Sequence, residues 1–173
     1  MIAKVSQAAF GRALVTNVLR GQVAEAIVAL ALEPEWNWCS ADYSGWDFER
    51  ADGLRLEVKQ SAAMQSWSTG KPSKAIFDVA ARTGYWESGT EWIAQVGRPA
   101  HIYIFAHHGI YADYADHRDP SQWQFYVVVA RDLPDVKQAA LSTISRFTEP
   151  VPISALADKV RVIASQIMNE GGV

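Results

Sequence analysis

Residues 45–60, with the sequence GWDFERADGLRLEVKQ, restrict the fold of this chain more than any other stretch. Apolar and charged residues alternate on both sides of an Ala-Asp-Gly turn at 51–53, which predicts a hairpin of two antiparallel strands. A three-residue loop with Gly53 in the left-handed conformation would pair Phe48 with Leu56. In this register the apolar side chains share one face, whereas a two-residue turn would mix apolar and charged side chains. The hydrophobic pattern therefore favours the three-residue loop.

The face opposite the apolar one gathers charged side chains. They are Asp47, Glu49, Arg55, Glu57 and Lys59. In the favoured register Asp47 lies across from Glu57. Two carboxylates roughly 5 Å apart repel each other and raise the pKa of one of them unless a cation compensates. Glu49 lies across from Arg55, which is a favourable pair but compensates only in part. Because carboxylate oxygens suit Mg²⁺ or Mn²⁺, the hairpin predicts a site for a divalent cation.

An amphipathic hairpin with an ordinary charged surface is the alternative interpretation. The acid-spacer-lysine pattern occurs twice, and the second copy, Asp135 to Lys137, lies in a proline-interrupted segment that we interpret as a solvated linker. The first copy has more context, because Asp47 precedes it across a short turn and Gln60 follows its lysine. Glu25 adds a further feature, since it lies in the otherwise apolar segment VAEAIVALAL. Such an acid either occupies the polar edge of a helix or faces a group that needs it.

The N-terminal part of the chain predicts helix followed by strands. An apolar stripe supports a helix over the first thirty residues: Leu14, Val15, Val18 and Leu19. Gly21 predicts either a break in this helix or a close approach of another segment to it, and Pro34 predicts the end of the helix. The aromatic-rich segment 36–62 predicts two or three antiparallel strands, and Ser, Gly and Pro residues indicate a loop at 64–74.

Further strands and a C-terminal helix are predicted for the rest. Residues 75–80 are typical of a short strand, and 101–108 and 123–130 are the strongest strand predictions. Because the last of these is almost continuously apolar, we expect it at the centre of the sheet. A helix is expected from Ser154 as N-cap, with glycines after its end. The chain then forms one domain, 1–173, of the α/β or α+β class, with a central mixed sheet flanked by helices.

The composition is typical of one globular domain, with 49% hydrophobic and 20% charged residues in 173. Cys39 is the single cysteine and lacks an evident base, so we expect a buried thiol, no intramolecular disulfide and no Cys/His zinc site. A formal charge of -3 argues mildly against a protein that coats nucleic acid without specificity. The N-terminus has no long apolar core, which predicts neither a signal peptide nor a membrane anchor and leaves the cytoplasm as the expected compartment.

Other residues are secondary candidates for a site. In the loop after the hairpin, Trp67, Lys71 and Lys74 are candidates for nucleic-acid binding, with a plain surface loop as the alternative. Arg82 is a candidate of the same kind. All four histidines fall within 101–117, but their spacing matches no zinc pattern, so we expect structural or surface roles.

These features together resemble the PD-(D/E)XK nuclease superfamily, whose fold is restriction-endonuclease-like. The likeness covers about residues 20–130 and rests on Glu25 in a helix, Asp47 on a strand and the sequence EVKQ from Glu57 to Gln60. Trp46 stands where the superfamily motif has proline.

The resemblance implies a role for each matched residue. Asp47 and Glu57 would be metal ligands, and Glu25 would support the metal directly or through water. Lys59 would position or activate the attacking water and stabilise negative charge on the phosphate. Gln60 would be an accessory catalytic residue beside the site.

The activity implied is that of a Mg²⁺-dependent endonuclease, with Mn²⁺ as a substitute, DNA as the expected substrate and a homodimer as an expected assembly. Bound Mg²⁺ lowers the pKa of its water and polarises the phosphoryl oxygen, while a lysine adds positive charge where negative charge develops. Two alternatives stay open. One is a catalytically inactive nucleic-acid-binding or protein-interaction module of the same fold, and the other is a structural protein whose hairpin carries ordinary surface charge.

Overall fold

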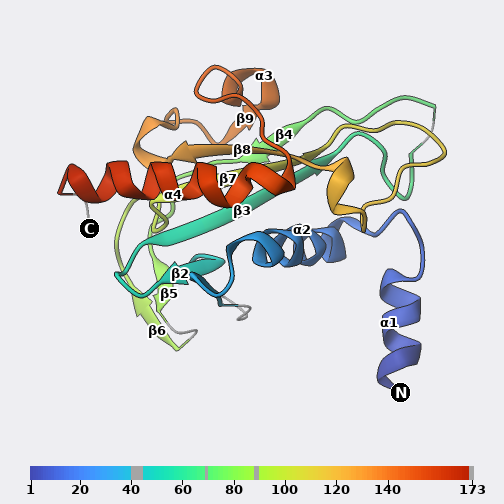
Figure 1. The fold of residues 1–173 in the computed structure, drawn as a ribbon, viewed down its shortest axis with the longest axis horizontal. Helices are drawn as coiled ribbons and strands as arrows, with labels where there is room; N and C mark the ends of the chain where they lie inside the picture. Colours follow the sequence, from blue (N-terminus) through green and yellow to red (C-terminus); the bar gives the residue numbers. More distant parts are fainter. Residues whose placement is uncertain (40–44, 69, 88–89, 172–173) are drawn as a thin grey trace.

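The structure, a computed structural model, describes residues 1–39, 45–68, 70–87 and 90–171. Helices flank a five-stranded sheet with the strand order β1-β2-β3-β7-β8 (Figure 1). The strands of this sheet are β1 (Trp36–Trp38), β2 (Phe48–Arg50), β3 (Arg55–Ala62), β7 (Ile102–His108) and β8 (Gln124–Val129). The sheet is mixed, because β3 and β7 run parallel while the other neighbours are antiparallel. The expected mixed sheet with flanking helices is therefore confirmed.

The remaining elements form the helical layer, two small ribbons and short helical turns. The longer helices are α1 (Ile2–Phe10), α2 (Asn17–Leu32) and α4 (Ile153–Asn169), and α3 (Leu141–Ile144) is a single turn. One ribbon pairs β4 (Ile76–Asp78) with β9 (Gln138–Ala140), and the other pairs β5 (Tyr85–Glu87) with β6 (Glu91–Ile93). Short 3₁₀ turns are η1 (Pro120–Gln122) and η2 (Ala130–Asp132).

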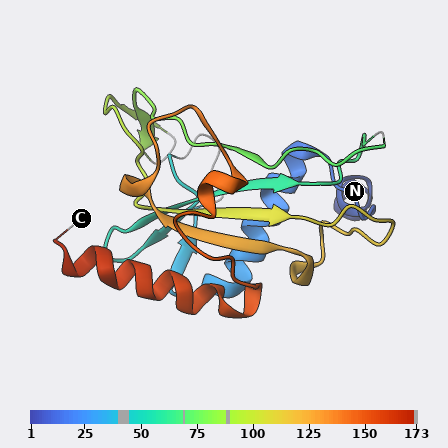
Figure 2. The same ribbon diagram turned by 90° about the horizontal axis from the view of Figure 1, so that it is seen from above.

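The two faces of the sheet are covered by different layers. Helices α2 and α4 pack together on one face, where even-numbered residues of β7 such as Ile102 and Ile104 point into the core (Figure 2). On the other face Tyr103 and Phe105 pack against the second core cluster, which includes residues of β4, β9 and α3. Burial of both faces explains why the sequence of β7 is apolar without alternation.

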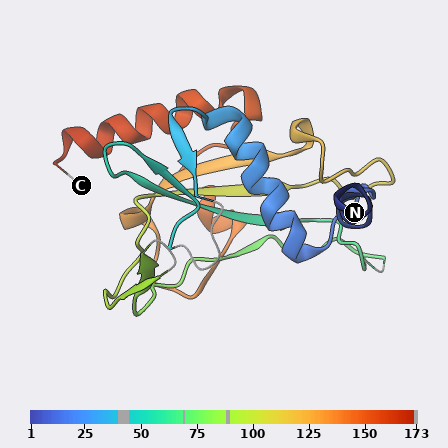
Figure 3. The same ribbon diagram turned by 90° about the horizontal axis from the view of Figure 1, so that it is seen from below.

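The crossover from β3 to the parallel strand β7 covers residues 63–101. In its described part it contains β4, β5 and β6 and no helix. The β5–β6 ribbon projects from the body at the end of the molecule away from α1 (Figure 3).

Three expectations about the helices require correction. Gly21 lies inside α2, and the chain leaves the helical conformation at Gly11 instead. Of the expected apolar stripe only Val15 is buried, while Val18 is 80% exposed. At the C-terminal helix Pro152, not Ser154, is the N-cap, and this helix begins without a side-chain cap hydrogen bond. Gly171 follows that helix with a positive φ, as expected.

Strand β8 is at the edge of the sheet, not at its centre as its apolar sequence predicted. Its side chains are nevertheless buried on both faces, with Phe125 in one core cluster and Tyr126 in the other. A continuously apolar strand sequence therefore indicates that both faces of the strand are buried, and it does not indicate how many strands lie beside it. The outer edge of β8 is partly closed by Val151, which exchanges two backbone hydrogen bonds with Phe125.

Candidate functional site

The β2–β3 hairpin has the register that the hydrophobic pattern favours. Phe48 pairs with Leu56 and Glu49 with Arg55. The three-residue loop 51–53 closes with a hydrogen bond from the Gly53 N–H to the Arg50 carbonyl (2.9 Å), and Gly53 has a φ of 86°. This left-handed conformation favours glycine, and it allows the loop that directs the apolar and charged side chains to separate faces.

Asp47 lies one residue before the first residue of β2. Its N–H donates to the Leu56 carbonyl (3.0 Å), and its Oδ2 accepts a hydrogen bond from the Val58 N–H (2.7 Å). Since Val58 is the residue between Glu57 and Lys59, the Asp47 carboxylate is held directly beside these two residues of β3. The Asp47 carboxylate is thus bound to the backbone between the predicted acid and the predicted lysine.

Burial raises the pKa of Asp47 well above its usual value, and the negative charges of Glu57 and Glu25 raise it further. The hydrogen bond from Val58 and the charge of Lys59 act in the opposite direction but do not outweigh burial. A nearby cation would stabilise the ionised form of a carboxyl group in such surroundings and lower its pKa. A raised pKa of one hairpin acid is what the sequence predicted for two facing carboxylates.

Lys59 forms an ion pair and a short hydrogen bond with Glu57 on the same strand. Burial alone would lower the pKa of Lys59, but the carboxylates of Glu57 and Asp47 outweigh it and raise this pKa. The amine therefore stays protonated. A protonated lysine stabilises charge and positions a ligand, but it does not accept a proton from water.

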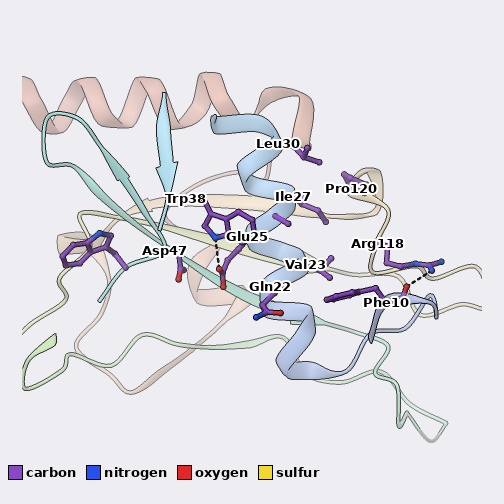
Figure 4. A pocket seen from close by; sticks show the side chains of 12 residues that line it. Phe10, Gln22, Val23, Glu25, Ile27, Leu30, Trp38, Asp47, Arg118 and Pro120 are labelled. Carbon is purple, nitrogen blue, oxygen red and sulfur yellow. Dashed lines mark hydrogen bonds between the residues drawn. The ribbon is translucent and has the colours of Figure 1, made fainter. Parts of the chain in front are cut away.

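Glu25 comes from α2 and is half-buried. Its Oε2 accepts a hydrogen bond from the Trp38 indole N–H (3.1 Å), and burial is the main cause that raises its pKa. Figure 4 shows that Glu25 and Asp47 lie at the same end of a groove between α2 and the hairpin. Glu25 is therefore not a solvated helix-edge acid, and it faces the hairpin acids as expected.

The four residues are divided between two hollows. Glu25 and Asp47 line a groove of about 770 Å³, whose other walls include apolar residues of α1 and α2. Glu57 and Lys59 line a second hollow of about 320 Å³ beside the β5–β6 ribbon. The hydrogen bond from Val58 to Asp47 links a lining residue of the first hollow to the strand that carries Glu57 and Lys59.

The side chains are compatible with a divalent cation, although not as a ready three-carboxylate cage. Among the described residues no group of three His, Cys, Asp or Glu side chains is close enough to hold a metal ion. Mg²⁺ commonly uses one or two carboxylates and keeps several waters. Asp47 with Glu57 or Glu25 would provide that set, and the raised pKa of Asp47 is the observation that favours it.

Gln60 points away from the charged face of β3. Its Oε1 accepts a hydrogen bond from Arg20 Nε (2.7 Å), and its amide donates to Asn17 Oδ1 (3.2 Å). Arg20 is 1% exposed and also donates to Gln65 (2.6 Å) and Asn17 (2.6 Å). Gln60 thus joins β3 to α2, and Arg20, which the sequence did not single out, is the centre of that junction. The apolar residues around Arg20 in the sequence gave no signal that it would be buried.

The loop residues stay exposed. Trp67 is 61% exposed, and Lys71 and Lys74 lie on the surface of the expected loop. They are accessible to a ligand, but none of the three lines either hollow. Arg82 does line the second hollow, where it pairs with Asp78 (2.6 Å).

The histidines have structural positions, as expected. His117 and His108 are fully buried with their rings in contact with each other and with Trp123. His117 Nδ1 accepts a hydrogen bond from the Val15 N–H (3.0 Å), and its Nε2 lies 3.0 Å from the Met64 carbonyl. Cys39 is half-buried, and burial raises the pKa of its thiol, which does not favour a nucleophile.

No family model, curated protein or solved structure matches this chain. Within the described residues, no helix is both long and apolar enough to cross a membrane.

Proposed function

We propose that this protein is a metal-dependent nuclease that hydrolyses phosphodiester bonds, with DNA as its substrate and a restriction-endonuclease-like arrangement of its core. The observation that carries the proposal is the hydrogen bond from the Val58 N–H to Asp47, which holds one half-buried carboxylate next to the strand that carries Glu57 and Lys59. Glu25 adds a third carboxylate from α2 at the same edge of the hairpin.

The chemistry assigns a separate task to each group. Mg²⁺ or Mn²⁺, when held by Asp47 with Glu57 or Glu25, supplies a water of lowered pKa and a Lewis acid for the phosphoryl oxygen. Lys59, protonated at neutral pH, supplies positive charge where the transition state accumulates negative charge. Binding of metal and phosphate would require the ion pair between Lys59 and Glu57 to open, so that Glu57 could hold the metal and Lys59 the phosphate.

The test is nicking of supercoiled plasmid and cleavage of oligonucleotides with Mg²⁺ or Mn²⁺. Lys59→Ala should lower the rate by roughly 10²–10³-fold, the usual effect of losing one group that stabilises transition-state charge. Lys137→Ala is the matched control, because it removes the lysine of the second acid-spacer-lysine copy, which is exposed and lines neither hollow. Cleavage by Lys59→Ala at the wild-type rate contradicts the mechanism. Binding in EDTA without cleavage in either metal favours the non-catalytic module of the same fold.

A further inference from the structure

The β5–β6 ribbon presents two tryptophans to solvent. Trp86 and Trp92 are cross-strand partners whose rings pack edge to face with centroids 5.5 Å apart. Their exposed fractions are 39% and 47%. Trp36, Trp46 and Trp123, by contrast, are buried in the body of the protein. A paired aromatic surface of this kind, left in water, marks a contact site more often than chance exposure does.

This ribbon is anchored to the candidate catalytic hairpin. Arg55, on the same face of β3 as Glu57, forms an ion pair with Glu87 (3.6 Å) and donates to the Tyr85 hydroxyl (3.5 Å). Its guanidinium also stacks on the Trp46 ring at 3.6 Å. The position of the two tryptophans relative to the hairpin is therefore set by contacts of β3 itself.

Two glycines allow the side chains of Trp92 and Tyr85 to lie close to the backbone. A Cβ at Gly84 would lie 2.5 Å from a ring carbon of Trp92, and a Cβ at Gly45 would lie 2.8 Å from the Tyr85 Cβ. Both distances are shorter than any ordinary carbon contact. Trp92 is thus packed against the backbone at Gly84, which leaves its other side to solvent and limits the rotamers that it can adopt.

Trp86 and Trp92 form one wall of the 320 Å³ hollow that Glu57 and Lys59 also line. The charged residues there occur as ion pairs, Lys59 with Glu57 and Arg82 with Asp78. The aromatic side chains of this hollow offer faces on which a flat ring can stack, and Lys59 of the same hollow is the group to which the proposed function assigns the phosphate. The volume of the hollow lies at the lower end of the roughly 300–1,000 Å³ typical of ligand sites.

We propose that this hollow binds an unpaired nucleobase next to the scissile phosphate, so that the substrate is single-stranded or locally opened nucleic acid. The position of the phosphate in this inference rests on the proposed nuclease function. The base site rests on the two tryptophans and does not depend on that function. Aromatic side chains bind bases of unpaired strands by stacking. Inside a duplex both faces of a base are already covered, so a base must leave the stack to enter such a hollow.

The test compares binding and cleavage for the full chain. Affinity is measured by fluorescence anisotropy, in EDTA to prevent cleavage, with a labelled single-stranded oligonucleotide and with the blunt duplex of the same sequence. The double variant Trp86→Ala/Trp92→Ala should bind the single strand roughly 5- to 150-fold more weakly, the effect of losing the stacking of a base on an aromatic side chain. Duplex binding should change by less than about twofold. Phe147→Ala removes an exposed aromatic residue outside both hollows and should leave both affinities unchanged.

A second variant separates stacking from folding of the ribbon. Trp86→Leu/Trp92→Leu keeps apolar volume without an aromatic face and should also lose single-strand binding, while Trp86→Phe/Trp92→Phe should retain most of it. Equal affinity of the wild type and both leucine and alanine variants for the single strand overturns the base site, even if the protein cleaves nucleic acid. Single-strand binding that depends on the tryptophans, without cleavage in Mg²⁺ or Mn²⁺, overturns the nuclease proposal and leaves the base site in place.

Discussion

The carboxylate of Asp47 accepts a hydrogen bond from the backbone N–H of Val58 at 2.7 Å. This single contact joins the residue before β2 to the middle of β3, between Glu57 and Lys59. It brings an acid into surroundings that are buried and already negative, which explains why its pKa is raised.

Asp47→Asn should stabilise the protein in EDTA. Because the pKa of Asp47 is raised in the folded protein, folding favours the protonated form, and the cost grows as the pH rises from the ordinary carboxyl pKa to the raised one. Above the raised pKa the full cost is present, and asparagine removes it while its side-chain carbonyl can still accept a hydrogen bond from the Val58 N–H. Thermal unfolding in EDTA should show a higher Tm for the variant, by about 2–4 °C for each kcal/mol recovered.

Mg²⁺ should then raise the Tm of the wild type but not that of Asp47→Asn, because only the wild type has the charge that binds it. Asp52→Asn is the control and should lower the Tm instead of raising it, because the neighbouring Arg50 lowers the pKa of Asp52 in the folded protein. The prediction is wrong if Asp47→Asn lowers the Tm in EDTA and Mg²⁺ shifts both proteins equally.

Two glycines should respond in opposite directions to alanine. Gly53 has a φ of 86° in the hairpin loop, where a Cβ costs about 1–2 kcal/mol. Gly21 lies inside α2, and a Cβ built there has no atom within 4 Å, so alanine should stabilise the helix by about 0.5–1 kcal/mol. Urea unfolding of the two variants measures both changes. A stabilising Gly53→Ala would show that the loop has a conformation other than the one described.

His117 should make the protein acid-sensitive. Burial, with the positive charges of Arg20 and His108, lowers the pKa of His117 from 6.5 to about 4. The folded protein therefore holds this histidine neutral, and stability present above pH 6.5 is lost as the pH falls toward 4. A shift of this size corresponds to a loss of about 3 kcal/mol over that interval.

Denaturant unfolding at several pH values between 7 and 4 measures this loss. His117→Gln should be less stable at pH 7, because it changes the contacts with Val15 and Met64, but its stability should decline less on acidification. Parallel pH profiles of the two proteins would assign the acid sensitivity to other groups.

Arg20 should be more important for stability than an arginine of the surface. It donates to Asn17, Gln60 and Gln65, and its removal leaves the side-chain carbonyl oxygens of the half-buried Gln60 and the buried Gln65 without this donor. Arg20→Met should therefore cost about 2–4 kcal/mol. Arg161→Met on the exposed side of α4 is the control and should change stability by less than about 0.5 kcal/mol. Equal effects in urea unfolding would contradict the central place of Arg20.

Local sequence patterns determined the hairpin and its register. Its apolar residues have to share one face, and only the loop through Gly53 satisfies this condition, so the positions of Phe48, Leu56, Glu57 and Lys59 followed from alternation alone. The strands β4, β7 and β8 and the C-terminal helix were also predictable, because their propensities and periodicity are strong. The position of β8 was not, because an apolar strand at an edge and one at the centre have the same sequence when both faces are covered.

Contacts between distant segments were decided only by the tertiary structure. Glu25 could have been a surface acid, and its place beside the hairpin depends on how α2 packs against β3, which no local pattern specifies. The same holds for the junction of Arg20 with Gln60, and for the tryptophans of the β5–β6 ribbon beside Lys59. The sequence by itself thus determined which side chains share a face of a strand. The packing of helices and ribbons around the sheet, which depends on shape and on long-range contacts, decided what those side chains face.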